Sequence, residues 1–172
     1  MLDPKLQFIY RGAKTKRYHT ADTLTSQTVG EHSFGVAWLV VLLCPDARKE
    51  LILAALAHDL AEHQVGDVSS PTKKKHPEIK EFLDATERSL LASVGLDFET
   101  KLFVYEKRVL KAADILDGMM FCLREFNMGS RAVIDVYLNF KSYYVAENFI
   151  RDNIGVYIFN NIDEEWSKLC RM

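Results

Sequence analysis

A histidine and an aspartate stand side by side at His58 and Asp59, inside a segment that is otherwise apolar. Burying a charged carboxylate costs free energy unless a hydrogen-bond partner or a metal ion compensates it. A metal ion would suit this pair because imidazole nitrogen and carboxylate oxygen both bind first-row metals. By itself the dipeptide fits an ordinary buried hydrogen-bonded pair slightly better, so other residues must decide between the two interpretations.

Two further metal-binding side chains lie in apolar segments of the kind that form core helices. His32 begins one apolar run, and Asp114 lies within the apolar stretch 109–116. Together with His58 and Asp59 they make four nitrogen and oxygen donors, which packing alone does not explain. The sequence therefore predicts a metal site built from nitrogen and oxygen donors.

Glu62 follows His58 by four residues and Asp59 by three. The apolar pattern predicts one continuous helix here, in which Glu62 projects from the same side and can handle the proton of a water molecule. His63 would point away from that side, which argues against the zinc-protease pattern of two histidines four residues apart.

The order His32, His58-Asp59, Asp114 resembles the H…HD…D signature of the HD-domain superfamily. The sixteen-residue block from His58 to Lys73 resembles the HDxxExxxGDxxxPxK stretch of its 5′-deoxynucleotidase branch. The short phage dATP triphosphohydrolases are similar in the same segment. The HD pair is common, whereas the longer block is specific.

Two shorter motifs extend the resemblance. Residues 30–33, Gly-Glu-His-Ser, resemble the family's SEHS turn with glycine in place of the first serine, and residues 111–114 resemble its KxAD motif. The match covers about residues 17–129. It implies an all-α fold with a single HD domain over residues 1–172, built as a bundle of about six to eight helices. The motif-bearing core would occupy 17–129, and further helices would follow at 131–172.

The residue pattern itself favours helices nearly throughout. Helical periodicity, with glycine or proline at the ends of the runs, predicts helices over about 29–44, 47–64, 77–94, 105–127, 131–153 and 163–171, and a loop over 66–76. Asp46 is expected to cap the second of these helices, and His58 and Asp59 to lie in its middle.

The resemblance implies a role for each candidate residue. The four donors would hold one or more divalent ions, with Co, Mn, Zn and Mg all open as the identity of the metal. Glu62 would orient or deprotonate the attacking water, and Asp67, just past the helix, would pass a proton to the leaving oxygen. Taken by itself, Asp67 fits a simple turn carboxylate equally well.

Five residues are predicted to contact the substrate. Arg17 and Lys73 would clamp phosphate, although each belongs to a basic run that also fits a solvated surface. Tyr18 stands where the family has tryptophan and would stack on the base. Thr20 would line the base pocket, and Pro71 would pack against the sugar.

Three functions remain open at this point. The first is a triphosphohydrolase that converts a deoxynucleoside triphosphate, dATP above all, to deoxynucleoside and triphosphate. The second is a 5′-deoxynucleotidase acting on monophosphates, and the shortness of the chain slightly favours the first. The third is a non-catalytic HD module that binds a nucleotide as a sensor, against which the proton-transfer residues Glu62 and Asp67 argue.

Composition argues against a large anionic partner, and the resemblance implies a small-molecule deoxynucleotide instead. The 172 residues carry 22 basic and 24 acidic side chains, and a net charge of −2 gives no reason to expect long nucleic acid or an anionic membrane as a partner. Three widely spaced cysteines predict free thiols in a reducing compartment.

The same features suggest where the protein works and with what. The apolar run 34–44 is too short to span a membrane, and a secretory signal is not evident. We therefore expect a cytoplasmic protein, and one encoded by a phage would act in the cytoplasm of its host. The C-terminal third is rich in aromatics, including Tyr137 and Trp166, which predicts a homo-oligomer, either a dimer or a hexamer.

Overall fold

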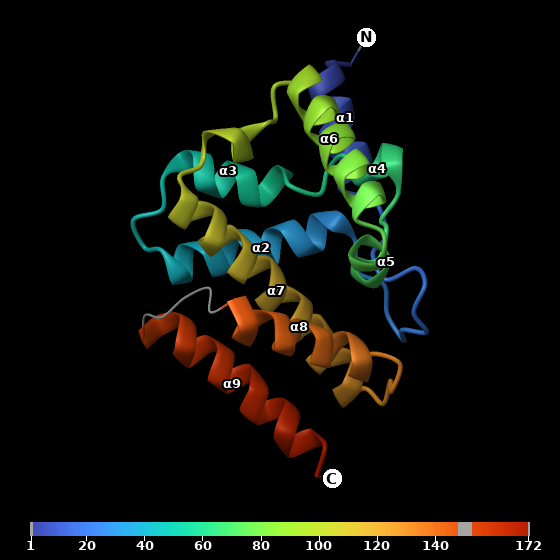
Figure 1. The fold of residues 1–172 in the computed structure, drawn as a ribbon, viewed down its shortest axis with the longest axis vertical. Coiled ribbons are helices and arrows are strands. Elements are labelled where there is room, and N and C mark those ends of the chain that lie inside the picture. The colour runs from blue at the N-terminus through green and yellow to red at the C-terminus, as the bar shows by residue number, and fades with distance from the viewer. Residues whose placement is uncertain (1, 148–152, 172) are drawn as a thin grey trace.

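The computed structural model describes residues 2–147 and 153–171, which form helices joined mostly by short connections, with a longer one over 13–28 between α1 and α2 (Figure 1). The helices are α1 (Pro4–Gly12), α2 (Val29–Leu43), α3 (Lys49–Ala57), α4 (Glu62–Val65), α5 (Ser70–Lys75), α6 (Pro77–Ser93), a 3₁₀ helix (Phe98–Lys101), α7 (Val104–Asn127), α8 (Ile134–Glu147) and α9 (Asn153–Leu169). The expected all-α fold is confirmed. Within the described ranges, none of these helices combines the length and the hydropathy needed to cross a bilayer.

The core lies where α2, α3 and α7 pack against one another, near the middle of the molecule (Figure 1). Helix α2 ends just before Pro45, as the sequence predicts. Val36 and Val40 of this helix are fully buried, and so are Leu116 and Met119 of α7. Full burial of each such side chain is worth about 1.5–3 kcal/mol, so the core fixes how α2 and α7 face each other.

The C-terminal helices α8 and α9 pack against α7. Tyr137 of α8 stacks on Trp166 of α9 with ring centroids 3.7 Å apart, and Phe126 of α7 contacts the same indole at 4.6 Å. Both members of the stacked pair are buried. Tyr137 and Trp166 therefore belong to the core of this chain, so these two aromatics give no support to the predicted homo-oligomer.

One expected helix is broken at the residues that carry the chemistry. A single helix over 47–64 is wrong, because α3 ends at Ala57 and residues 58–61 form a turn before α4. Three backbone N–H groups in this stretch bond to the carbonyl three residues earlier rather than four: Leu60, Glu62 and Gln64. The chain winds more tightly here than an α-helix does, so His58 and Asp59 lie on a turn.

The cap expected at Asp46 is also wrong. Asp46 lies in a turn, and α3 begins after Arg48, whose side chain does not cap the helix. The guanidinium of Arg48 instead donates to the buried carboxylate of Glu106 on α7, at 2.6 Å. A tertiary ion pair thus holds the start of this helix in place of a local cap.

Three other expected boundaries differ from the structure. Residues 70–75 form α5, so the segment 66–76 is more than a loop. The last helix, α9, begins ten residues earlier than the 163–171 helix expected from the sequence. Helix α8 is shorter than the expected 131–153, and part of that range, 148–152, lies outside the described residues.

Glu125 of α7 anchors the connection between α1 and α2. Its fully buried carboxylate accepts hydrogen bonds from the backbone N–H groups of Leu24 and Thr25, at 2.6 and 2.9 Å, and from the Thr25 hydroxyl. Hydrogen bonds to a charged acceptor are worth about 1.5–3 kcal/mol each. The segment that carries Arg17 and Tyr18 is therefore held against the C-terminal half of α7.

Candidate metal centre

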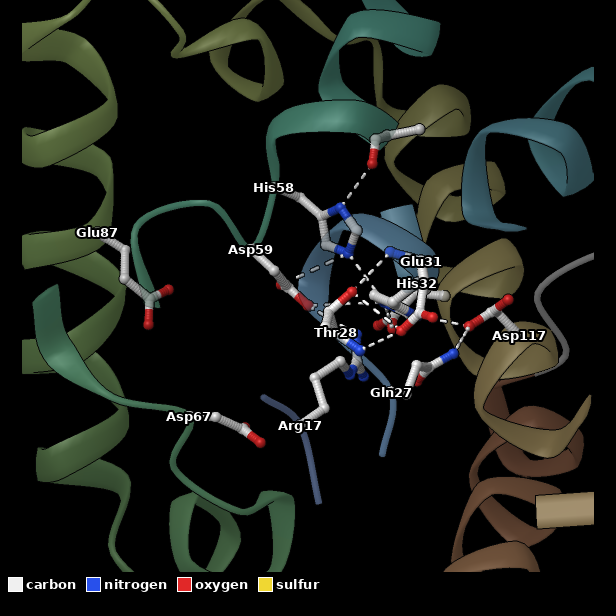
Figure 2. Close-up of polar contacts among 12 residues, drawn as sticks. Arg17, Gln27, Thr28, Glu31, His32, His58, Asp59, Asp67, Glu87 and Asp117 are labelled. Carbon is white, nitrogen blue, oxygen red and sulfur yellow. Dashed lines mark hydrogen bonds and ion pairs between the residues drawn. The ribbon is translucent and has the colours of Figure 1, made fainter. Parts of the chain in front are cut away.

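The four predicted donors come from three parts of the fold and meet in one cluster. His32 lies on α2, and His58 and Asp59 lie on the turn after α3 (Figure 2). Asp114 lies on α7. Nε2 of His32 lies 3.3 Å from Nε2 of His58 and 3.2 Å from Oδ1 of Asp114. It also lies 3.5 Å from Oδ2 of Asp59. One ligand atom each from His32, His58 and Asp59 lies within 4.8 Å of the others, a spacing that a single metal ion can span.

The position of His32 follows from the start of α2. Thr28 caps this helix: its hydroxyl accepts from Glu31 N at 3.2 Å, and the Glu31 carboxylate accepts from Thr28 N at 2.7 Å. This reciprocal capping box fixes the first turn. His32 then begins the next turn on the inward side, where its side chain is fully buried.

The two imidazoles point their Nε2 atoms at each other. Nδ1 of His58 donates to the carbonyl of Ala55 at 2.9 Å, and Nδ1 of His32 donates to Oδ2 of Asp117 at 2.6 Å, because these oxygens can only accept. In a neutral imidazole the remaining Nε2 is then a bare acceptor. Acceptors 3.3 Å apart, flanked by carboxylates, repel one another unless a proton or cation lies between them. The donor set therefore fits a divalent cation.

Both carboxylates of the cluster stay ionised. Burial opposes ionisation of Asp59, but the charges of His58 and Arg17 hold its pKa below the usual value. Burial also works against Asp114, and Lys111, which donates to it at 2.7 Å, brings its pKa well below the usual range. Two negative groups thus face the imidazoles at neutral pH, as a divalent metal requires.

Protonation of His32 reflects the same excess of negative charge. Burial lowers the pKa of His32, and its hydrogen bonds to Asp114 and Asp117 more than reverse this, so the pKa is raised. A proton on the imidazole and a metal ion are alternative ways to neutralise the cluster, so the two compete for the same nitrogen.

Glu62 is buried beside the cluster, at the start of α4. One of its oxygens, Oε2, has no hydrogen-bond partner among the described residues. Burial, together with the charges of Asp59 and Asp67, raises the pKa of Glu62 to about 10. Gly66, with φ 84°, turns the chain after α4 and leads to Asp67, whose Oδ2 lies 3.7 Å from Nδ1 of His19.

His63 takes no part in the cluster, as the sequence predicts. Its Nδ1 donates to the carbonyl of Leu60 at 2.7 Å, and its ring packs edge-on against Phe8 with centroids 4.6 Å apart. The zinc-protease arrangement is therefore not formed.

The two predicted phosphate clamps have partners within the protein. Arg17 donates to Oδ2 of Asp59 at 2.9 Å, so its guanidinium reaches the cluster (Figure 2). Lys73 lies on α5 with its Nζ 3.9 Å from Oε1 of Glu87 on α6. Lys73 also lowers the pKa of Glu62, as does Arg17. Both cations are thus close enough to influence the same carboxylate electrostatically.

The other predicted substrate contacts are less tightly grouped. Tyr18 has a left-handed backbone, φ 56°, and its ring stacks on Phe121 of α7 at 4.4 Å. Thr20 is exposed on the connection between α1 and α2, and Pro71 is exposed in the first turn of α5. Their proposed contacts with base and sugar stay predictions.

Sequence reasoning missed two residues next to the cluster. Asp117 accepts from His32 and also from Nε2 of Gln27, at 3.0 Å (Figure 2). The spacing of three residues from Asp114 to Asp117 puts both on one face of α7, and this signal was present in the sequence. Gln27 precedes the cap of α2 and carries no comparable signal.

A family model described as "5'-deoxynucleotidase YfbR-like" matches residues 5–145. The dATP triphosphohydrolase of cyanophage S-2L is 29% identical over 132 residues, covering 71% of this chain and 71% of that protein. The 5′-deoxynucleotidase VV1113 of Vibrio vulnificus is 27% identical over 137 residues, covering 67% of this chain and 71% of its own length.

A solved structure has the same fold. The cyanophage S-2L HD phosphohydrolase (DatZ), bound to dA and one catalytic Zn²⁺ ion, superposes with a TM-score of 0.67 at 18% identity. The alignment covers 100% of this chain and 99% of that one. The predicted resemblance to the HD superfamily and its 5′-deoxynucleotidase-like branch is confirmed.

We expect Glu62→Gln to stabilise the metal-free protein at neutral pH. Folding raises the pKa of this carboxyl from 4.5 to about 10. Between these two pH values the Glu62 carboxyl is ionised in the unfolded chain, whereas folding must either protonate it or bury its negative charge. Its contribution to the free energy of unfolding is therefore most favourable below pH 4.5 and falls as the pH rises toward 10. A neutral amide avoids this loss, on the order of 1–3 kcal/mol at pH 7.

Urea denaturation in EDTA, near pH 7.5 and again near pH 4.5, measures the effect. The gain should be large at the higher pH and small at the lower one. Glu81→Gln, at an exposed position on α6, is the matched control and should be neutral at both. A gain for Glu62→Gln that does not depend on pH would contradict the prediction.

Proposed function

Since the chain belongs to the YfbR-like 5′-deoxynucleotidase family of HD-domain proteins, we propose that it is a divalent-metal-dependent phosphohydrolase acting on deoxynucleotides. The observation that carries this proposal is the cluster formed by His32, His58, Asp59 and Asp114. These four side chains would hold the metal. When bound, the ion would supply positive charge to a phosphate oxygen and make water more acidic.

Glu62 is proposed to take the proton from the attacking water. In the metal-free protein burial keeps this carboxyl protonated near pH 7, since its pKa is raised to about 10. The positive charge of a bound ion would favour the carboxylate, whose Oε2 has no hydrogen-bond partner among the described residues and could accept the proton. Water oxygen bonds to the phosphorus next to the sugar as the bond to the 5′ oxygen breaks. Asp67 would give the leaving 5′ oxygen its proton, and Arg17 and Lys73 would bind the phosphate oxygens.

The preferred substrate is proposed to be a deoxynucleoside triphosphate. An enzyme that releases intact triphosphate must hold three linked anionic groups, which calls for cations beyond the metal. Helix α5 ends in three lysines, of which Lys73 lies near Glu87 of α6 and influences Glu62. The similarity to the cyanophage dATP triphosphohydrolase supports adenine as the base. Tyr18 would stack on that base, with Thr20 beside it and Pro71 against the sugar.

A monophosphate substrate is the second candidate. The matching family model and the Vibrio relative are both described as 5′-deoxynucleotidases. A monophosphate needs only enough positive charge for one phosphate, which Arg17 and the metal could supply without Lys73. The two candidates share the metal site and the role of Glu62, so only their products separate them.

We also propose that the protein acts in the cytoplasm, where a phage-encoded enzyme of this family would meet the nucleotides of its host. Its cysteines, Cys44, Cys122 and Cys170, form no disulfide with one another. Cysteines outside disulfides are typical of reducing compartments.

The proposal that the chain forms a homo-oligomer, a dimer or a hexamer, gains a different basis from the structure. Phe34, Trp38 and Leu42 are 64%, 56% and 52% exposed. Their spacing of four residues places them along one stripe of α2. A contiguous apolar stripe of this kind marks a protein–protein interface more often than a bare surface.

We expect Trp38→Glu to lower the mass of the particle in solution. If a second copy covers the α2 stripe, a glutamate at its centre buries a charge and weakens association. If the stripe faces water, the same charge has little effect. Sedimentation of wild type and variant measures this. Tyr157→Glu, at a 68% exposed site on α9, is the control and should leave the mass unchanged. A monomeric wild type would refute the oligomer.

We expect Glu62→Ala and Asp114→Ala to fail in different ways. Glu62→Ala should keep the metal and slow turnover by about 10²–10⁴, the usual worth of a positioned acid or base. Asp114→Ala should lose metal and turnover together. Metal analysis after dialysis, paired with rates, measures both, with the exposed Asp135→Ala as control. Stoichiometric metal and normal turnover in Asp114→Ala would overturn the site.

We expect dATP to yield deoxyadenosine and inorganic triphosphate. Lys73→Ala should harm this reaction more than the cleavage of dAMP, whereas the exposed Lys75→Ala should harm neither. Chromatography of the products decides the substrate. Orthophosphate from dAMP with no turnover of dATP would establish the 5′-deoxynucleotidase, and tight binding of both without turnover would favour the sensor.

A further inference from the structure

His32 makes its shortest polar contact with a residue outside the proposed metal ligands. Its Nδ1 lies 2.6 Å from Oδ2 of Asp117, on the side away from Asp59 (Figure 2). The imidazole is fully buried, and the Asp117 side chain is 13% exposed. Because a carboxylate only accepts, the hydrogen of the imidazole must sit on Nδ1. The lone pair of Nε2 is thereby turned toward His58 and Asp114.

Asp117 is itself held in place from two other elements. Nε2 of Gln27, a residue only 8% exposed, donates to the same Oδ2 at 3.0 Å. Gly35 of α2 packs directly against the other oxygen, since a Cβ built there would come 2.0 Å from Oδ1. The carboxylate is therefore confined by α7, by α2 and by the segment before α2.

We propose that Asp117 is a positioning residue for the metal centre. It fixes the tautomer and ring orientation of His32, and Gln27 and Gly35 fix Asp117. This inference rests on the proposed metal site. In metal sites generally, a carboxylate behind a ligating histidine is worth about 10–100-fold in metal affinity. The alternative is that the hydrogen bond between His32 and Asp117 is an ordinary buried one, which affects the free energy of unfolding and leaves metal affinity unchanged.

Metal affinity separates these two roles. Removing the carboxylate frees the His32 ring to rotate and to place its hydrogen on Nε2, where it blocks the metal. We expect Asp117→Ala to bind Zn²⁺ about 10–100-fold more weakly than wild type. Asp117→Asn keeps an acceptor oxygen but loses the charge, so it should fall between the two. Competition titration against a chelating dye measures the affinities, without any substrate.

Asp163→Asn is the matched control. Asp163 of α9 accepts from the Tyr137 hydroxyl at 3.2 Å and from Lys141 at 2.9 Å, remote from His32 along the chain and on other helices. Its loss should change the free energy of unfolding and leave the Zn²⁺ affinity as in wild type. Gly35→Ala, which pushes against Asp117 without removing it, should weaken Zn²⁺ binding as Asp117→Ala does.

The imidazole ¹⁵N signals of the zinc-loaded protein give a second readout. In wild type the His32 hydrogen should be on Nδ1, and its signal should shift in Asp117→Asn because the acceptor has lost its charge. Wild-type Zn²⁺ affinity in both Asp117 variants, with an unchanged His32 signal, would overturn the positioning role and leave the proposed function standing. A wild-type protein that binds no Zn²⁺, Mn²⁺, Co²⁺ or Mg²⁺ would refute both.

Discussion

The contact between the imidazoles of His32 and His58 is the constraint on which the rest of the site depends. Nδ1 of His32 donates to Asp117, and Nδ1 of His58 donates to the Ala55 carbonyl. The two Nε2 atoms therefore face each other, 3.3 Å apart. Two acceptors this close, beside ionised carboxylates, are unfavourable without positive charge between them. Arg17 and Lys111 offset part of that charge from outside the cluster, and a divalent ion would offset it from within.

The fold gives up local stability to make this arrangement. The chain leaves the α-helical path at residues 58–61, although their sequence is suited to a helix. Glu62 is buried with one oxygen unsatisfied among the described residues, and Tyr18 adopts a left-handed backbone beside Arg17. A left-handed backbone outside glycine and a buried polar atom without a partner each cost on the order of 1–3 kcal/mol, and they persist only where surrounding packing enforces them. The three-helix core of α2, α3 and α7 supplies that packing.

The sequence predicted the donors better than the backbone that carries them. His32, Asp59 and Asp114 could be recognised because charged groups are conspicuous in apolar runs. The break after Ala57 could not, because the apolar pattern and the helix propensity of Leu60 and its neighbours continue through it; tertiary position overrides such propensity. Likewise, aromatic content could not reveal whether side chains such as Trp166 pack in the core or cover the surface, since only the arrangement of α7, α8 and α9 decides this.

One face of α7 contacts both the His/Asp cluster and the connection between α1 and α2. Asp114, Asp117, Phe121 and Glu125 are spaced by three, four and four residues, so they share that face. Asp114 and Asp117 both contact His32, and Phe121 stacks on the ring of Tyr18. Glu125 accepts from the backbone of residues 24–25. Asp114, the residue proposed to position His32 and the anchor of the segment that carries Arg17 and Tyr18 therefore keep fixed distances along one rigid helix. A shift of α7 would disturb all of these contacts together, and the buried side chains that α7 shares with α2, α3, α8 and α9 oppose such a shift.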